Sequence, residues 1–189
     1  MRRYLLVLAV AVVALAGCTG GHDAVAQTGS IDSKYVGADG KTIVYPVAQR
    51  KAAPDVKGST VDGGSADLAS LRGDVVVLNF WAAWCPPCRL ESTDLESVYK
   101  STKDSGVAFL GVNSHDEKDS AKAFQDARLT YPSLFDPTGR IALSFSDVPP
   151  TALPCTLIID RTGKVAVVIR NGVTVASLTP LVNQVLAES

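Results

Sequence analysis

The stretch of sequence that decides the fold is VVVLNFWAAWCPPCR, residues 75–89. Its first part, residues 75–80, is nearly continuous in apolar side chains, which is typical of a central strand covered on both faces. Two thiols, Cys85 and Cys88, follow directly after this strand. Residues 89–103 then indicate a helix, because apolar residues recur there at helical spacing. The sequence therefore predicts a strand followed by a helix, with a pair of cysteines at the junction.

The chain continues in the same alternating way. A short hairpin is predicted around Asp39 and Gly40, and a loop around Leu134 and Phe135. The remaining prediction has a turn at residues 61–64, short helices at 67–71 and 140–145, a helix at 117–128, strands at 107–112, 155–159 and 164–169, and a last helix that begins near Thr179 and Pro180. Alternation implies parallel strands joined by helices, with an antiparallel pair at the end. We therefore expect an α/β fold whose central mixed sheet is flanked by helices, with a hairpin at its N-terminal end.

The first residues indicate export. Two arginines precede an apolar run at residues 5–16, which is too short to cross a bilayer of ~30 Å comfortably. The run ends in LAGC, residues 15–18, which resembles the lipobox of bacterial lipoproteins. We expect residues 1–17 to be a lipoprotein signal peptide and Cys18 to carry lipid. Ordinary secretory cleavage and a retained apolar anchor are the alternatives.

Lipidation would anchor the protein on the extracytoplasmic face of the cell membrane, where thiols tend to oxidise. Residues 18–33 are rich in Gly, Ser, Thr and Ala and are expected to form a flexible tether to a domain at residues 34–189. The chain has 18 basic and 19 acidic residues, and without the arginines of residues 1–17 the balance is 16 against 19. Because no long basic run occurs, nucleic acid is excluded as a partner.

The cysteine pair is placed for redox chemistry. Free N–H groups and the dipole of the helix stabilise a thiolate at Cys85, and the thiolate is the nucleophile in disulfide exchange. Cys88 lies almost one turn later, so we expect it to be the more buried, resolving thiol beneath an exposed Cys85. Pro86 and Pro87 have no N–H, which leaves chiefly the Cys88 amide to serve Cys85. We expect only moderate acidification of Cys85 and a reducing couple.

Two other readings of the pair stay open. A zinc site needs four ligands, and only Cys155 and His115 remain as soft candidates. A fixed structural disulfide is the second, since exported proteins carry such bridges. No metal or other cofactor is expected.

The segment NFWAAWCPPCR, residues 79–89, resembles the active-site segment of the thioredoxin superfamily. It is most similar to the membrane-tethered thiol-disulfide oxidoreductases of the TlpA/ResA kind. APD at residues 53–55, LRGD at 71–74 and PCTLIID at 154–160 resemble that family in the same order. The resemblance runs from about residue 50 to the C-terminus. It implies a thioredoxin-like fold with a helix and loop inserted between Ser114 and Arg140.

The resemblance also implies a substrate-binding surface. Pro154 is expected to follow a cis peptide bond and to face the cysteine pair, with an ordinary trans proline as the alternative. Leu153 would then offer backbone hydrogen bonds to an extended segment of a partner. Trp84, Pro86 and Pro87 are expected to complete this surface.

Three positions depart from the family pattern. Asn79 replaces a buried acid that moves protons in cytoplasmic thioredoxins, so water or Glu91 is expected to serve Cys88. Thr93 replaces a helix-kinking proline, which predicts a straighter helix. Cys155 replaces the common Thr after the cis-Pro. It is interpreted as a small buried apolar residue, with a third thiol close to Cys85 as the alternative.

These features predict a thiol-disulfide oxidoreductase, most simply a reductase of protein disulfides. The resemblance implies a membrane relay of the DsbD or CcdA type as electron donor, and apocytochrome c or similar proteins as clients. The alternatives are a disulfide-forming oxidase, a thiol peroxidase, and a tethered binding module with a static disulfide.

Overall fold

The computed structural model describes residues 35–188, apart from residue 38 and residues 146–152. The predicted signal peptide, the lipidated Cys18 and the tether lie outside the described residues. Within the described part, no helix is long and apolar enough to cross a membrane.

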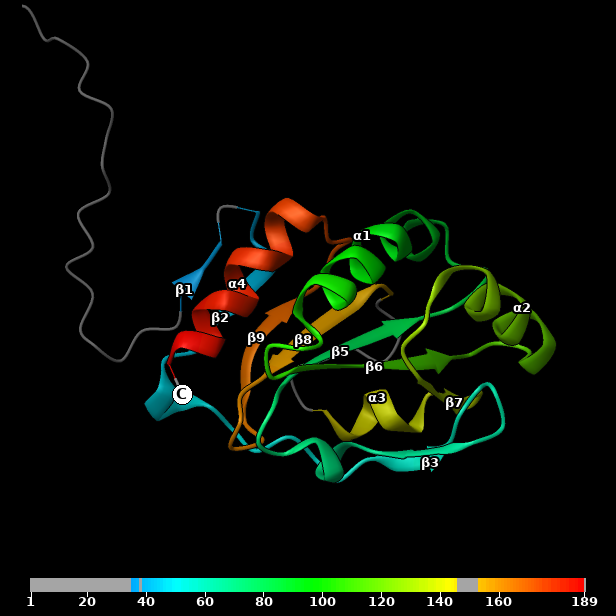
Figure 1. Ribbon diagram of the computed structural model, residues 1–189, viewed down its shortest axis with the longest axis horizontal. Helices are drawn as coiled ribbons and strands as arrows, with labels where there is room; N and C mark the ends of the chain where they lie inside the picture. Colours follow the sequence, from blue (N-terminus) through cyan, green and yellow to red (C-terminus); the bar gives the residue numbers. More distant parts are fainter. Residues whose placement is uncertain (1–34, 38, 146–152, 189) are drawn as a thin grey trace, which may run out of the picture.

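The centre of the fold is a seven-stranded mixed sheet, with strand order β1-β2-β9-β8-β5-β6-β7 (Figure 1). The strands are β1 (Tyr35–Val36), β2 (Thr42–Val44), β5 (Val75–Trp81), β6 (Val107–Ser114), β7 (Ser133–Asp136), β8 (Cys155–Ile159) and β9 (Val165–Ile169). Strands β5, β6 and β7 are parallel, whereas β8, β9, β2 and β1 continue the sheet with antiparallel pairings. The predicted α/β class and mixed sheet are confirmed.

Two hairpins lie at the margins of this sheet. The first, β1–β2, turns at Asp39 and Gly40 as predicted, and the Asp39 carboxylate accepts hydrogen bonds from the Lys41 and Thr42 N–H groups. The second joins β3 (Lys57–Ser59) to β4 (Ser65–Asp67). It covers edge strand β7 through a bridge between Thr60 and Leu134, so part of that edge is not free to pair with another chain.

Helices cover both faces of the sheet. They are α1 (Pro86–Thr102), α2 (Lys118–Arg128), α3 (Arg140–Ser144) and α4 (Val175–Ala187), with short 3-10 helices η1 (Val47–Gln49) and η2 (Leu68–Leu71). Buried residues of α1, α2 and α4 belong to one apolar cluster, and those of α3 and η2 belong to a second. Figure 1 shows α1 and α4 running side by side over the sheet. Helix α1 is unbroken through Thr93.

Strand β5 separates the two clusters. Val77 and Trp81 face the cluster under α1, while Leu78 and Phe80 face the cluster under α3. Every residue of β5 is buried, as predicted for a central strand with both faces covered.

Three elements differ most from the prediction. The region around Leu134 is strand β7 rather than a loop, because it pairs in parallel with β6 despite the prolines that flank it. Helix α1 already begins at Pro86, whose missing N–H costs nothing in a first turn. Helix α4 begins at Val175, where Thr174 and Ser177 form a capping box, so Pro180 lies inside the helix instead of opening it.

Candidate active site

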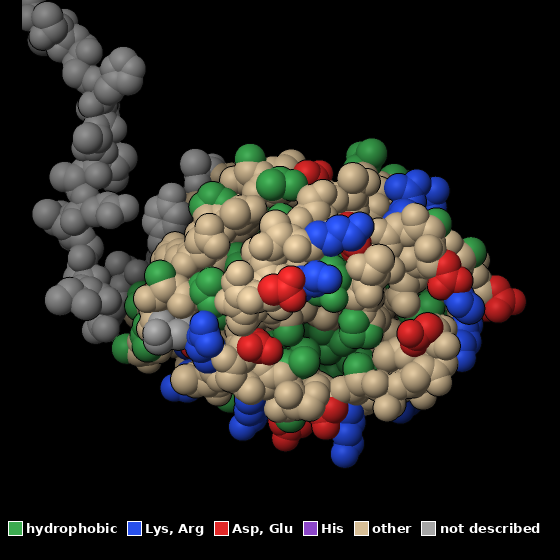
Figure 2. Space-filling view, in the orientation of Figure 1, with side chains coloured by type: hydrophobic (Ala, Val, Ile, Leu, Met, Phe, Trp, Pro, Cys, Tyr) green, Lys and Arg blue, Asp and Glu red, His purple; other side chains and the backbone are tan. Residues whose placement is uncertain are grey.

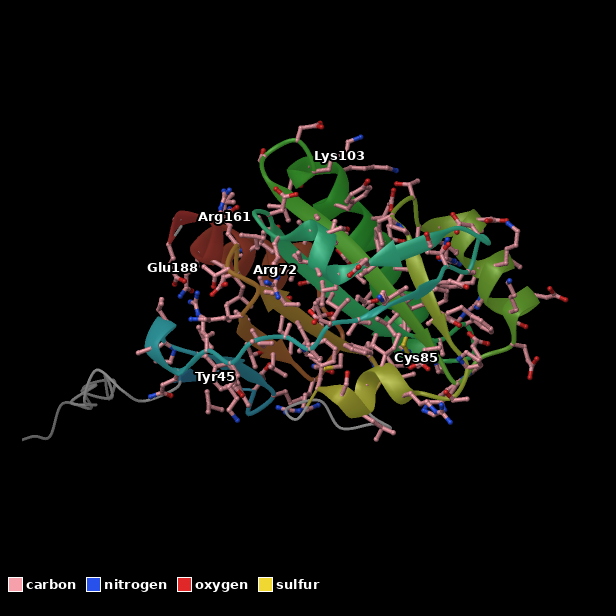
Figure 3. The ribbon with its side chains drawn as sticks, turned by 90° about the horizontal axis from the view of Figure 1, so that it is seen from below. Tyr45, Arg72, Cys85, Lys103, Arg161 and Glu188 are labelled. Carbon is pink, nitrogen blue, oxygen red and sulfur yellow. A yellow bond between two sulfur atoms is a disulfide. The ribbon has the colours of Figure 1, made fainter. Side chains whose placement is uncertain are left out.

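Cys85 and Cys88 form a disulfide at the N-terminus of α1, just beyond the C-terminal end of β5, with an S–S distance of 2.05 Å. Cys85 is the N-cap of the helix, and its Sγ accepts a hydrogen bond from the Cys88 N–H at 3.3 Å. In Figure 3, Cys85 lies at the opposite end of the molecule from Lys103, which follows the other end of α1. The helix therefore directs its positive end toward the sulfur pair.

The expectation of an exposed Cys85 above a buried Cys88 is wrong for this disulfide state. Both residues are only 2% exposed and belong to the apolar cluster under α1. The reason is geometric, since the disulfide holds the Cys85 sulfur against Cys88 inside that cluster. The exposed groups around the pair are its neighbours Trp84, Pro86 and Pro87. A partner therefore meets these side chains before it meets a sulfur.

The segment before Cys85 is held by the connection between β6 and α2. The Asp116 carboxylate accepts hydrogen bonds from the Ala83 N–H at 2.6 Å and from Asn113 Nδ2 at 2.9 Å. Trp84 Nε1 donates to the His115 carbonyl at 2.7 Å, although the Trp84 side chain is 59% exposed. The position of Asp116 beside Ala83 was not predicted from sequence. The polar run after β6 was the sequence signal that could have predicted it. The C-terminal ends of neighbouring parallel strands lie at one edge of a sheet, so residues that follow β6 come close to those that follow β5.

Glu91 lies one helical turn after Cys88 on α1 and is 2% exposed. Its Oε1 accepts a hydrogen bond from Asn79 Nδ2 at 2.9 Å, and its Oε2 accepts one from the Val173 N–H at 2.9 Å. Asn79 also donates to Thr156 Oγ1 at 3.1 Å. Burial raises the pKa of Glu91 to about 7, against the opposing effect of the two hydrogen bonds. A carboxyl group with that pKa can both accept and release a proton near neutrality.

The predicted cis peptide bond before Pro154 is present, and it leads directly into β8. Leu153 is partly buried and packs against both apolar clusters. That Leu153 and Pro154 face the cysteine pair stays a prediction.

Cys155 lies on the other side of the sheet from the disulfide. It is a free thiol, 0% exposed, and it belongs to the cluster under α3 together with its register partner Phe80. Burial raises the pKa of Cys155 to about 12. These features agree with its interpretation as a packing residue, and they separate it from the face on which Cys85 lies.

No group of three or more His, Cys, Asp and Glu residues in the described part of the chain could hold a metal ion. On the face shown in Figure 2, acidic and basic side chains are interspersed rather than gathered by sign. That face therefore lacks the basic stripe that a nucleic-acid footprint requires.

Comparisons with known proteins point in one direction. Residues 50–168 match the model of the AhpC/TSA family. The thiol-disulfide oxidoreductase ResA of Geobacillus thermodenitrificans (strain NG80-2) is 33% identical over 129 residues, which cover 68% of this chain and 72% of the relative. ResA of Bacillus subtilis (strain 168) is 31% identical over 138 residues, 72% of this chain and 75% of the relative. A secreted thiol-disulfide isomerase from Corynebacterium glutamicum has a similar structure, with a TM-score of 0.74, 31% identity, and coverage of 82% of this chain and 98% of that one.

Proposed function

This chain belongs to the AhpC/TSA family, and from that premise we propose that it is an extracytoplasmic thiol-disulfide oxidoreductase that reduces disulfides in other proteins. The observation that carries the proposal is the Cys85–Cys88 disulfide at the N-terminus of α1. The ResA relatives support the thiol-disulfide oxidoreductase activity, and the secreted isomerase from Corynebacterium glutamicum supports the extracytoplasmic setting.

The reaction begins with the reduced pair. The Cys85 thiolate attacks one sulfur of a client disulfide, so a mixed disulfide forms and the other client sulfur leaves as a thiolate. Cys88 then attacks the Cys85 sulfur, which re-forms the Cys85–Cys88 bond and releases the second client thiolate. Two electrons pass from the pair to the client. Glu91, one turn from Cys88 and with a pKa of about 7, accepts the Cys88 proton as that thiol becomes the nucleophile.

The hydrogen-bond donors around Cys85 support the proposed direction of electron transfer. The Cys88 N–H reaches the Cys85 sulfur, whereas Pro86 and Pro87 have none to offer. Limited stabilisation of the thiolate leaves the reduced form without a large advantage, which favours a reducing couple. Equilibration with glutathione or dithiothreitol buffers tests this. A potential near about −270 mV supports a reductase, and one near about −120 mV supports the oxidase instead.

The burial of both half-cystines favours a second candidate, a module with a fixed disulfide. The two differ in how readily the bond opens. A redox-active bond is reduced by stoichiometric dithiothreitol in the folded protein, as followed by Trp fluorescence and thiol counting. A fixed bond resists until the protein unfolds.

After each cycle the Cys85–Cys88 disulfide must be reduced again by electrons that come through the membrane. We propose a relay of the DsbD or CcdA type as the donor, apocytochrome c as a client, and a lipid on Cys18 that keeps the protein at the membrane surface. A Cys88→Ser variant in the native cell retains its client as a mixed disulfide, and mass spectrometry of the trapped species identifies it. A Cys18→Ala variant should lose the membrane fraction. Peroxide consumption by the purified domain would favour the peroxidase alternative.

A further inference from the structure

A groove lies beside the disulfide, between α1 and α2. Its cavity of about 980 Å³ is lined by Ala83, Trp84 and Arg89 on one side and by Ala123, Phe124 and Arg128 of α2 on the other. A second hollow of about 510 Å³ shares Ala127 and Arg128 and extends the groove along α1 as far as Lys100. The groove thus starts at the residues that precede Cys85 and follows the two helices away from it.

The groove carries two guanidinium groups on one aromatic ring. Arg89 and Arg128 each lie 5.3 Å from the centre of the Phe124 ring. Among the described residues, neither forms an ion pair with a carboxylate. Arg89 Nη1 donates to the Ala83 carbonyl at 3.1 Å, and stacking on an aromatic ring leaves the other N–H edges of the two guanidinium groups available for a carboxylate.

The carboxylates near the two guanidinium groups either have other hydrogen-bond partners or lie at a distance. Asp116 is occupied by the Ala83 and Glu117 N–H groups and by Asn113. Glu96 is occupied by Thr130 and Lys100. Glu117, which also lines the groove, precedes α2, whereas Arg128 ends it, so about 16 Å of helix separates the two. The Asp116 carboxylate and Arg89 both bond to the backbone of Ala83, whereas Arg128 lies at the end of the groove away from Glu117, and this end is the cationic one.

We propose that this groove binds the client segment that flanks the reactive cysteine, and that Arg89 and Arg128 select an acidic side chain in that segment. The inference rests on the proposed function, because a mixed disulfide at Cys85 brings the client chain past Trp84. The exposed side chains of Ala123 and Ala127 provide an apolar wall for its side chains. This surface is separate from the backbone of Leu153, so the two can hold opposite sides of one client cysteine.

The test uses peptides with one cysteine, each blocked as a mixed disulfide with 5-thio-2-nitrobenzoate. The peptides differ only in a short run beside the cysteine that contains Glu, Gln or Lys, placed on its amino side in one set and on its carboxyl side in another. The reduced full chain attacks the peptide sulfur, the blocking S–S bond breaks, and the coloured thiolate that leaves gives the rate. Cys88 then displaces the peptide thiol, so each turnover oxidises the cysteine pair once.

With the unaltered protein at low salt, the Glu peptide of one set should react faster than the Lys peptide by about tenfold, as one or two exposed ion pairs allow. The ratio should fall toward one at about 1 M salt, where charges are screened within about 3 Å. Arg128→Gln should lower the ratio toward one at low salt, and Arg128→Glu should lower it further, because Arg89 then remains the only cation of the pair. Arg128 is exposed, so neither change disturbs the core.

Lys118→Glu is the matched control, because it makes the same change of charge on the same helix but outside the groove. It should keep the ratio of the unaltered protein. Equal rates for the Glu and Lys peptides in both sets would overturn the proposal that the groove selects acidic segments. An equal change of the rate ratio in Lys118→Glu and Arg128→Glu would overturn it too. If even the Gln peptides release no thiolate, the proposed function fails, and the groove inference falls with it.

Discussion

Cys85 follows the C-terminal end of β5, and Cys155 begins the neighbouring strand β8. They belong to apolar clusters on opposite faces of the sheet, and both are buried almost completely. Cys85 caps a helix, accepts the Cys88 N–H, and has Glu91 one turn beyond its partner. Cys155 is surrounded by the apolar cluster under α3, and burial raises its pKa to about 12. Low exposure is thus common to a proposed redox centre and a packing residue. The difference lies in the polar groups that can stabilise a thiolate or receive a proton.

Among the substitutions that test this comparison, removal of the Cys85 thiol should have the largest effect on activity. Cys85→Ser removes the nucleophile, so disulfide reduction by the purified protein should be abolished. Insulin reduction and thionitrobenzoate release measure this, and circular dichroism verifies that the fold is retained. Residual turnover above the rate without protein would show that Cys85 is not the attacking group.

The next effect should come from the buried carboxyl group. Glu91→Gln removes the proton acceptor beside Cys88, so the resolution step should slow by about 100- to 10,000-fold, as for a lost general base. The rate in the unaltered protein should rise with pH through about 7, where Glu91 ionises. Rapid mixing over pH 5 to 9 measures both. An unchanged pH profile in Glu91→Gln would assign the proton route to water.

The same group should make stability depend on pH. The pKa of Glu91 rises from 4.5 to about 7 on folding, so the folded state binds the proton more tightly than the unfolded chain. Its favourable contribution is complete below pH 4.5 and is lost as pH rises through 7. The loss approaches roughly 3 kcal/mol. Urea unfolding at pH 5 and pH 8 should show this loss in the unaltered protein but not in Glu91→Gln. A parallel loss in both would point to other groups.

The smallest effect is expected on the opposite face. Cys155→Ser places a hydroxyl among apolar side chains and should reduce the free energy of unfolding by about 1–3 kcal/mol. Turnover should stay unchanged, because Cys155 faces away from the disulfide. Urea unfolding and insulin reduction measure the two quantities. A loss of turnover with the fold intact would make Cys155 part of the redox centre after all.

The sequence carried most of the fold but only part of the site. The apolar run of β5, the turn at Asp39 and Gly40, and the helix after the cysteines depend on local patterns, and each is present. Strand β7 was missed, because two flanking prolines dominate its local signal and only pairing with β6 makes it a strand.

The contacts that position the site depend on tertiary structure. The Asp116 carboxylate meets the Ala83 N–H across 33 positions of sequence. The Val173 N–H meets Glu91 across 82 positions. The burial of Cys85 likewise depends on packing around the disulfide. The Val173 contact and the burial of Cys85 leave no periodic or compositional signal in the chain, and the Asp116 contact leaves only the polar run after β6.

The hydrogen bond from Val173 to Glu91 gives the protein a built-in spectroscopic probe. The Val173 nitrogen lies outside the cysteine pair, yet its proton points at the Glu91 carboxylate, whose charge would change with each cycle of the proposed reaction. Its amide resonance should therefore move with the ionisation of that carboxylate and separate its protonated and charged populations without any chemical label. An amide just before α4 thus reports the protonation state of a carboxyl group in the first part of α1.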